Sequence, residues 1–436
     1  MGFFGRKRAP SVPHPRKEPR FDGPLTLERL EQIFQDCVDF TKRPVSLGEG
    51  GACTLTLCYL SGMVKMERVS DYVLRPLAQD EALARCGTPR QAMDRMKDGA
   101  LYNLSAEERT RLDAAVFDLV NGCCLLLFPG ESSVLSLNVG TEEKRSISSP
   151  SNETVLKGSR DAFVESLRTN TSIVRRHLKA PELRIREQVV GRQSVTSVDI
   201  LYIEGLTNPH LVEQVAAQLA DIDIDAVLAT GNIEEYIVPA ARTAFPLVQY
   251  TERSDRFCAG LAEGRGGILI DGLPLGYLAP GVLGDFLQAP QDKSESWLLA
   301  SPLTLLRHLC MLGTLLLPAL YVAMVTFHQE MIPTRLALSI IAAKQDVPFR
   351  SVFEVIVLLL AFEILQEAGL RLPQSIGQTV SIIGGLVVGS AAVEAKIISP
   401  AVLIVVAIAG IAGYTMPSQE VAGALRIWRF LLALLA

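Results

Sequence analysis

The distribution of apolar residues divides this chain into a mixed front part and a strongly apolar last third. From Trp297 to Ala436, 15 of 140 residues are charged, against 74 of the preceding 296. A membrane-crossing helix needs about 20 mostly apolar residues. Three runs approach or reach this length: Leu309–Phe327, Gln374–Ala395 and Ser399–Pro417. The pattern therefore predicts an α-helical polytopic membrane domain over 297–436.

The front part carries a pattern that occurs twice. Thr54–Gly62 and Ser197–Gly205 are strand-like runs that end in Tyr-x-x-Gly, and a helical stretch follows each. A second apolar strand precedes another glycine in Asn121–Gly130 and in Gly264–Gly272. The glycine-to-glycine distances, 62 to 130 and 205 to 272, differ by one residue. This matched spacing predicts two copies of one α/β unit; two unrelated units with a similar rhythm are the alternative.

Polar and proline-rich segments set the predicted domain boundaries. The expected parts are a disordered basic arm over 1–24, a first α/β subdomain over 25–145, a Ser- and Pro-rich linker over 146–159, a second subdomain over 160–296, and the helical domain. Helices are predicted over Thr26–Phe40 with Thr26 as N-cap, over Leu104–Ala115 from the capping box Ser105-x-x-Glu108, and over Asp161–Leu178.

Composition excludes several classes of protein. With 42 Lys and Arg against 47 Asp and Glu, the chain lacks the basic field that nucleic-acid binding requires. Its eight cysteines form no CxxC pair and its five histidines are scattered, so no metal site is predicted, and the cysteines are expected to be small buried side chains in a reducing compartment. No GxSxG, Walker or HExxH motif occurs, so neither an enzyme nor a cofactor is predicted.

Acidic residues in the apolar last third are the best candidates for a functional site. Intramembrane carboxylates are unfavourable and usually face a polar interior or a water path. Glu354 and Glu363 interrupt the apolar run Val352–Leu365, and they lie about 180° apart on a regular helix. Gln329 and Glu330 follow the first predicted span. These four residues are candidate pore or gating groups, with hydrogen bonding between helices, interfacial placement or capping of a turn as the alternatives.

Small residues and flanking charges complete the picture of the last third. Gly384, Gly385 and Gly389 lie in the predicted span 374–395, where small residues let helices approach closely. Arg307 precedes the first span, and no signal peptide is recognisable, so the positive-inside rule places the N-terminal domain in the cytoplasm. The apolar run Phe430–Ala436 at the end of the sequence is expected to be an incomplete last helix.

Several long motifs resemble one known family in its motif order. FPLVQYTERSDRFCAGLAEGRGGILIDGLP (Phe245–Pro274), HQEMIPT (His328–Thr334), DIDIDAVLATGNIEEYI (Asp221–Ile237) and the segment Ile364–Pro400 are similar to the A subunits of bacterial spore germinant receptors. The segment Lys157–Ser166 is similar both to those A subunits and to the paralogous stage V sporulation AF-type proteins.

The resemblance implies a multi-pass subunit of the spore inner membrane that contacts membrane lipids. Its implied partners are a B-type amino-acid-sensing membrane subunit and a C-type lipoprotein, and it implies an oligomeric, germinant-gated cation channel. A homo-oligomer built on the duplicated front domain is the expected form. The alternatives are a non-conducting scaffold of the receptor and a transporter accessory subunit. A transporter predicts inverted repeats among the spans, and none is visible.

Overall fold

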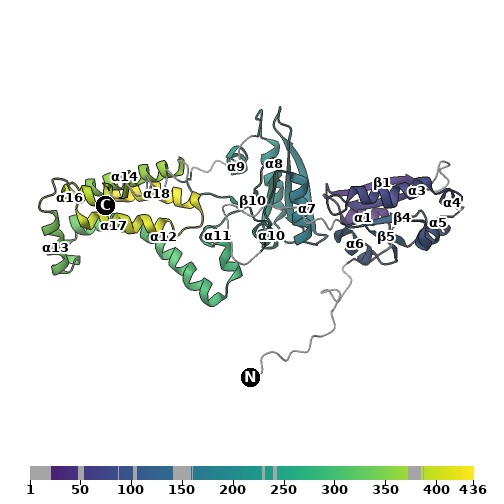
Figure 1. Cartoon of the computed structure of the whole chain (residues 1–436), viewed down its shortest axis with the longest axis horizontal. Helices are drawn as coiled ribbons and strands as arrows, with labels where there is room; N and C mark the ends of the chain where they lie inside the picture. The colour runs from purple at the N-terminus through teal and green to yellow at the C-terminus, as the bar shows by residue number, and fades with distance from the viewer. Residues whose placement is uncertain are drawn as a thin grey trace, which may run out of the picture. The chain divides into compact units, whose positions relative to one another are not determined.

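The computed structural model of the chain describes residues 21–47, 54–86, 88–101, 106–140, 159, 161–227, 231–238, 243–371, 384–385 and 387–436. These residues form two compact units, whose elements are labelled in Figure 1. The first unit takes the described residues of 1–154, 159–239 and 250–279, and the second takes those of 240–249 and 280–436. The predicted arm over 1–24 and linker over 146–159 lie almost entirely outside the described residues.

The first subdomain is built on a five-stranded sheet in the order β1-β2-β4-β5-β3. Its strands are β1 (Phe40–Ser46), β2 (Thr54–Leu60), β3 (Ala106–Arg109), β4 (Cys123–Leu127) and β5 (Val134–Asn138). Its helices are α1 (Leu27–Ile33), α2 (Met66–Val69), α3 (Arg75–Gln79), α4 (Glu81–Ala84), α5 (Pro89–Arg95) and α6 (Leu112–Val120), with π-helical turns η1 (Ser70–Leu74) and η2 (Met96–Ala100).

Alternating side chains of β2 supply two separate cores in this subdomain. Leu55, Leu57 and Tyr59 pack with apolar residues of α2 to α5 on one face. Cys58 and Leu60 pack with α1 and α6 on the other face. Because successive strand residues point to opposite faces, an uninterrupted apolar run is required when helices cover both sides of a sheet.

The second subdomain repeats this arrangement. Its strands β6 (Leu183–Val190), β7 (Thr196–Ile203), β8 (Gln249–Thr251), β9 (Gly266–Ile270) and β10 (Gly276–Ala279) are ordered β6-β7-β9-β10-β8. Its helices are α7 (Leu167–His177), α8 (Pro209–Ala220), α9 (Gly231–Ile237) and α10 (Ser254–Ala262). Strand by strand, this is the order of the first sheet, which is what a duplicated unit predicts.

The strand pairing refines the predicted fold class. The pairs β1–β2, β2–β4, β6–β7 and β7–β9 are all antiparallel. Parallel strands joined by crossover helices define an α/β fold, so these two subdomains are α+β units in the strict sense.

One predicted helix is wrong and others have different bounds. Ala106–Arg109, expected to be helical, is strand β3 and pairs with Val134–Leu137 of β5. Pairing with β5, together with the ion pairs that Glu108 makes to Arg90 and Lys97, outweighs the local capping signal. Ser105 of that capping box lies outside the described residues.

The other two helices are shorter than predicted. The N-cap role of Thr26 is confirmed, since its Oγ1 accepts from the Arg29 N–H at 3.3 Å, but α1 ends at Ile33. Helix α7 begins only at Leu167, whose N–H donates to Asp271 Oδ1 at 3.0 Å. A residue 104 positions away thus marks the start of α7, which local sequence does not reveal.

The two subdomains are joined within the first unit by backbone and side-chain bonds. Cys37 forms a parallel bridge to Ile185 of β6, with the Val38 N–H donating to the Ile185 carbonyl at 3.0 Å. Arg175 of α7 donates from Nε and Nη2 to the two carboxylate oxygens of Asp39, at 2.8 and 3.0 Å. Both charged side chains are buried, so the pair holds the subdomains in one register.

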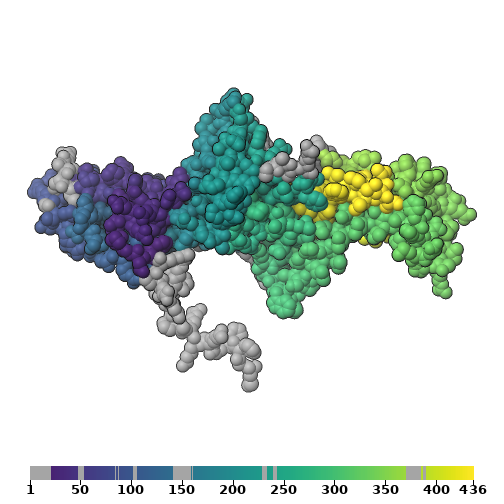
Figure 2. Space-filling model, turned by 180° about the vertical axis from the view of Figure 1, so that it is seen from behind, coloured from purple at the N-terminus to yellow at the C-terminus, as the bar shows by residue number. Residues whose placement is uncertain are grey.

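The second unit is helical. It contains α11 (Leu283–Leu287), α12 (Trp297–Thr326), α13 (Thr334–Lys344), α14 (Ser351–Arg371), α16 (Ala392–Glu394), α17 (Pro400–Gly413) and α18 (Gln419–Leu435), with short turns η3 (Pro290–Ser294), η4 (Gln329–Met331) and η5 (Val387–Ala391). Helices α12, α14, α17 and α18 pack around Val322, Leu358 and Val406 (Figure 1). Figure 2 shows the yellow residues of α18 at the surface, flanked by green helices of the same unit.

Among the described residues, one helix is long and apolar enough to cross a membrane by length and composition. This helix is α12, with 30 residues, and it contains all of the predicted span 309–327 except its last residue. Helix α17 covers only 14 residues of the predicted span 399–417. Most of Gln374–Ala395 lies outside the described residues, so a polytopic domain stays a prediction. The terminal apolar run belongs to α18, which begins at Gln419.

Candidate functional site

Glu354, a predicted pore residue, is buried among three segments of the second unit. It lies in the first turn of α14, and its side chain is almost fully buried. Its Oε2 accepts from the Ser399 N–H at 2.8 Å, and Ser399 is the N-cap of α17. Its Oε1 lies 3.4 Å from the Lys344 ammonium of α13, an ionic contact without hydrogen-bond geometry. A carboxylate at two helix N-termini interacts favourably with both helix dipoles.

Glu363 lies nine residues further along α14 and meets a different helix. Its Oε1 accepts from Arg429 Nη2 at 2.7 Å, and its Oε2 accepts from Arg426 Nη1 at 3.4 Å. Both arginines belong to α18, and Arg429 is buried. Two guanidiniums therefore neutralise this carboxylate within the chain, and the Nε of Arg429 has no hydrogen-bond partner among the described residues.

The structure places Gln329 and Glu330 away from these buried contacts. Both lie in the exposed turn η4 after α12. Gln329 Nε2 donates to the Val325 carbonyl at 3.0 Å, and no hydrogen bond among the described residues joins either side chain to Glu354 or Glu363. The four candidates thus lie in one buried site, one partly buried site and one exposed turn, and not in a single cluster.

The three candidate packing glycines have different surroundings. A Cβ added at Gly384 would lie 1.9 Å from Leu365 Cδ2 of α14, so the Leu365 side chain would have to move to admit a larger residue. The nearest atom to a Cβ at Gly389 would be Leu403 Cδ2 at 4.0 Å, and nothing lies within 4 Å of one at Gly385. The close approach occurs at one glycine of the three.

Sequence reasoning missed the cationic partners of both carboxylates. The sequence patterns described above single out neither Lys344 nor Arg426 and Arg429. A signal was present, because the two arginines are three residues apart and so share a helix face. Cations on one face of an apolar helix require an anionic partner, and Glu363 was an available carboxylate.

The first unit holds one more buried carboxyl that the sequence did not single out. Asp199 of β7 lies 3.2 Å by Oδ2 from Arg168 Nη1, and its Oδ1 accepts no hydrogen bond among the described residues. Arg168 also binds Glu187. Burial raises the pKa of Asp199 to about 7, although the Arg168 charge opposes this shift. The carboxyl therefore titrates near neutral pH.

No group of three or more His, Cys, Asp or Glu side chains in the described part of the chain could hold a metal ion. Burial raises the pKa of Cys58 to about 12 and that of Cys258 to about 12 as well. Thiols in such surroundings are poor nucleophiles and poor metal ligands at neutral pH.

Comparison with known proteins gives consistent matches. The chain is 37% identical over 410 residues to the uncharacterized membrane protein YfkQ of Bacillus subtilis, covering 94% of this chain and 79% of that protein. It is 37% identical to spore germination protein KA of B. subtilis, covering 90% of this chain and 72% of the relative. It is 34% identical to spore germination protein GerLA of Bacillus cereus, covering 91% and 80%.

A solved structure and a family model complete the comparison. The crystal structure of the N-terminal domain of the A subunit of the Bacillus megaterium spore germinant receptor GerK3 matches with a TM-score of 0.47 and 27% identity, covering 59% of this chain and 94% of that one. The family model described as Bacillus/Clostridium GerA spore germination protein matches residues 28–436. This chain therefore belongs to the GerA family of spore germination proteins.

Proposed function

We propose that this chain is a membrane subunit of a spore nutrient-germinant receptor, and that several copies assemble around a cation path that opens when nutrient is sensed. The observation that carries the proposal is the presence of a buried carboxylate, Glu354, and a partly buried one, Glu363, in an apolar helical unit, because such acids are retained mainly where ions or protons move. Family membership supports the role in germination.

Several parts of this proposal extend the family match. A B-type membrane subunit would sense the nutrient, and a C-type lipoprotein would complete the receptor. The second unit would cross the spore inner membrane several times, and the duplicated first unit would lie in the cytoplasm as an oligomeric collar. Gln329 and Glu330 would line an entrance, since their turn is exposed.

We propose Glu363 as the gate, which its ion pairs with α18 support. While Arg426 and Arg429 bind it, the carboxylate has no free charge to offer a passing cation. Opening would separate α18 from α14 and turn Glu363 toward a wet path, where a ring of carboxylates selects cations. The Nε of Arg429 has no hydrogen-bond partner among the described residues, and an ion pair that leaves a buried donor unbonded would need less free energy to open.

A second function, a non-conducting scaffold, is favoured by a specific observation. Both carboxylates find their partners within the same chain, so they could hold helices together without any water path. A scaffold needs these ion pairs for stability only, and their neutral replacement would change the amount of assembled receptor and nothing else.

Nutrient-triggered cation release tests the proposal against the scaffold. Spores would carry Glu354→Gln and Glu363→Gln, singly and together, with Glu394→Gln as the matched control at an exposed carboxylate. Release is measured per assembled receptor, quantified by immunoblot. The channel predicts that Glu363→Gln changes the rate and cation selectivity of release, while the control does not. Release that stays normal per receptor in the double variant contradicts the pore role.

A further inference from the structure

Strand β6 is an edge strand that already accepts a short stretch of backbone. It ends the second sheet on one side, next to β7. The outward groups of Ile185 bind the first subdomain, since its N–H donates to the Asp36 carbonyl at 3.1 Å and its carbonyl accepts from the Val38 N–H at 3.0 Å. The segment Asp36–Val38 therefore covers only the first part of this edge, around Ile185.

The next outward groups of β6 have no backbone partner among the described residues. Backbone groups of alternate strand residues point the same way, so Glu187 and Val189 face outward as Ile185 does, while the even-numbered residues pair with β7. No backbone hydrogen bond from a described residue reaches Glu187 or Val189 on this side. Val189 is 58% exposed and the side chain of Glu187 is 24% exposed, so this part of the edge is at the surface of the described residues.

The usual protection of an exposed edge is missing here. Edge strands are commonly shielded by charged side chains or proline. The charged side chains of β6 are instead held by internal ion pairs, with Arg184 bound to Glu204, Arg186 to Glu213 and Glu187 to Arg168. These pairs draw the side chains toward neighbouring elements and leave the backbone accessible.

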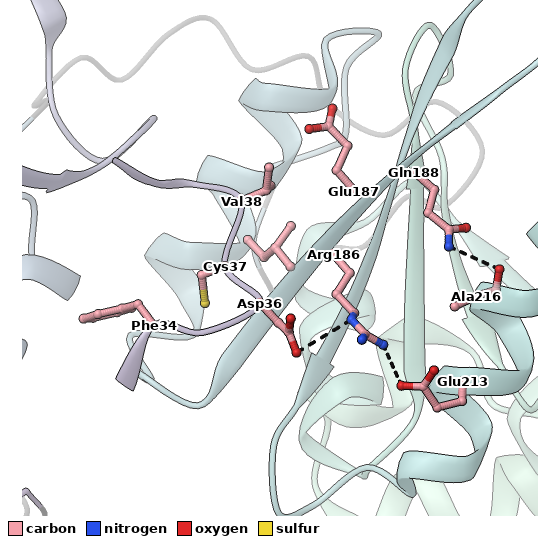
Figure 3. A pocket seen from close by; sticks show the side chains of 10 residues that line it. Phe34, Asp36, Cys37, Val38, Arg186, Glu187, Gln188, Glu213 and Ala216 are labelled. Atoms are coloured by element: carbon pink, nitrogen blue, oxygen red, sulfur yellow. Dashed lines mark hydrogen bonds and ion pairs between the residues drawn. The ribbon is translucent and has the colours of Figure 1, made fainter. Parts of the chain in front are cut away.

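A groove of about 540 Å³ runs along this edge (Figure 3). Phe34, Cys37 and Val38 of the first subdomain form one wall, and Ala216 and Glu213 of α8 form the other. Figure 3 shows Arg186 between Asp36 and Glu213, with Gln188 donating to the Ala216 carbonyl beside it.

The groove has an excess of negative charge. Asp36, Glu187 and Glu213 line it with one guanidinium, that of Arg186, so three carboxylates against one cation leave a net charge of −2. The buried Oε1 of Gln188, which also lines the groove, accepts no hydrogen bond among the described residues. These groups would bind a peptide segment that carries hydrogen-bond donors and positively charged side chains.

We propose that β6 binds an extended, lysine- or arginine-bearing segment of a partner protein, which adds a strand to the sheet beyond the Asp36–Val38 bridge. Main-chain bonds to Glu187 and Val189 would give affinity, and the carboxylates of the groove would select cationic side chains. A second copy of this chain is a poor occupant, because pairing two β6 edges would bring two grooves of net charge −2 together. This inference does not depend on the proposed channel.

Hydrogen exchange on the full chain in detergent tests the proposal. The probe is an alternating lysine–threonine heptapeptide, compared with the glutamate–threonine version and with a lysine–threonine version that has proline at its centre. We expect the lysine probe to slow amide exchange of Glu187 and Val189, and the other two peptides to leave it unchanged. Equal binding of the acidic peptide, or no protection at these two amides, overturns the proposal.

Two variants of the chain distinguish the contribution of main-chain hydrogen bonds to peptide binding from the contribution of the groove's carboxylates. Val189→Pro removes an outward N–H only, a change that edge strands tolerate, and should abolish protection. Glu213→Lys should weaken binding of the lysine probe about fivefold, whereas Gln214→Lys, a cation added on the same helix, should leave it within about twofold. If deleting residues 1–20 strengthens binding instead, the occupant is the chain's own basic segment and a partner protein is excluded.

Discussion

Arg175 in the first unit and Arg429 in the second are both buried guanidiniums paired with a carboxylate, and they differ in how many of their donors are used. Arg175 donates from Nε and Nη2 to Asp39, and its other contacts reach the Ala180 carbonyl and Cys37 Sγ. Arg429 donates from Nη2 to Glu363, while its Nε has no partner among the described residues.

The Arg175–Asp39 pair has more hydrogen bonds and is less accessible to solvent than the Arg429–Glu363 pair. Glu363 is also more exposed than Asp39, at 21% against 5% of its side chain. A fully bonded buried pair is strongly destabilised when one partner is removed, whereas a partly bonded, partly solvated pair has less to lose. The Arg175–Asp39 pair thus uses more donors and is more deeply buried than the contact of Glu363 with Arg426 and Arg429.

The largest effect is expected from Arg175→Leu. It leaves Asp39 as an uncompensated buried charge between the subdomains, and should lower the free energy of unfolding by about 3–5 kcal/mol. Denaturant unfolding of the full chain in detergent measures this. Arg176→Leu, a partly buried arginine of the same helix, is the control and should cost less than about 1 kcal/mol. If Arg175→Leu and Arg176→Leu lower the free energy of unfolding equally, the ion pair with Asp39 does not contribute to stability.

Glu363→Gln should cost less, about 1–2 kcal/mol, because Glu363 and Arg426 keep partial access to solvent and the Nε of the buried Arg429 has no hydrogen-bond partner among the described residues. The same unfolding measurement, run beside Arg175→Leu, compares the two pairs directly. If Glu363→Gln lowers the free energy of unfolding as much as Arg175→Leu does, the Glu363 ion pairs are structural and the argument for a gate fails.

The third prediction concerns pH and the first unit only. Asp199 has a pKa of about 7 in the folded chain and near 3.8 when unfolded, so the folded state holds this proton more tightly. Stability should therefore fall as pH rises from about 4 to 7. Asp199→Asn removes this dependence and should be more stable than the parent at pH 8 by on the order of 1–3 kcal/mol, but not at pH 4.

Melting temperatures of both chains from pH 4 to 8 check this prediction. The charged groups that act on Asp199 are Arg168 from α7, Glu187 from β6, and Asp39 and Asp271. Because Arg168 keeps its ion pair to Glu187, the Asn variant retains a partner for that arginine. Parallel pH curves for parent and variant would show that Asp199 is not the group responsible.

The smallest effect is expected at a glycine of the subdomain interface. Gly62 has φ of 81°, and an added Cβ would lie 2.1 Å from Ser172 Oγ of α7. Gly130 has φ of 77° with nothing within 4 Å, so Gly130→Ala reports the backbone strain alone, about 1 kcal/mol. Gly62→Ala should exceed it, and Ser172→Ala in the Gly62→Ala background should restore part of the difference. Identical melting temperatures for the two alanine variants would show that Ser172 moves aside freely.

Much of the first unit could be predicted because its signals are local. The apolar runs of β2, β4, β7 and β9 and the helix α8 lie where the sequence pattern places them, since strand and helix periodicity depends on neighbouring residues. The helix predicted from the capping box Ser105-x-x-Glu108 was wrong at Ala106–Arg109 because these residues form β3, which pairs with Val134–Leu137 of β5. The antiparallel direction of the strands was also not visible, because a buried run reads the same in both directions.

The sequence predicted the acidic residues of the candidate site but not the residues that bind them. Glu354 and Glu363 stand out in an apolar run, but their partners Ser399 and Arg429 lie 45 and 66 residues away. Such pairs depend on how helices pack, which hydropathy does not encode.

By itself, the sequence determined the duplication, the apolar last third, the presence of acids within it and the family, because each is written in local pattern or spacing. Only the tertiary structure decided which charges meet, that Asp39 binds Arg175 while Glu363 binds Arg429, and that Glu187 and Val189 of β6 have no outward backbone partner among the described residues. The reason is physical: ion pairs and strand edges are set by long-range packing, in which residues far apart in the chain become neighbours.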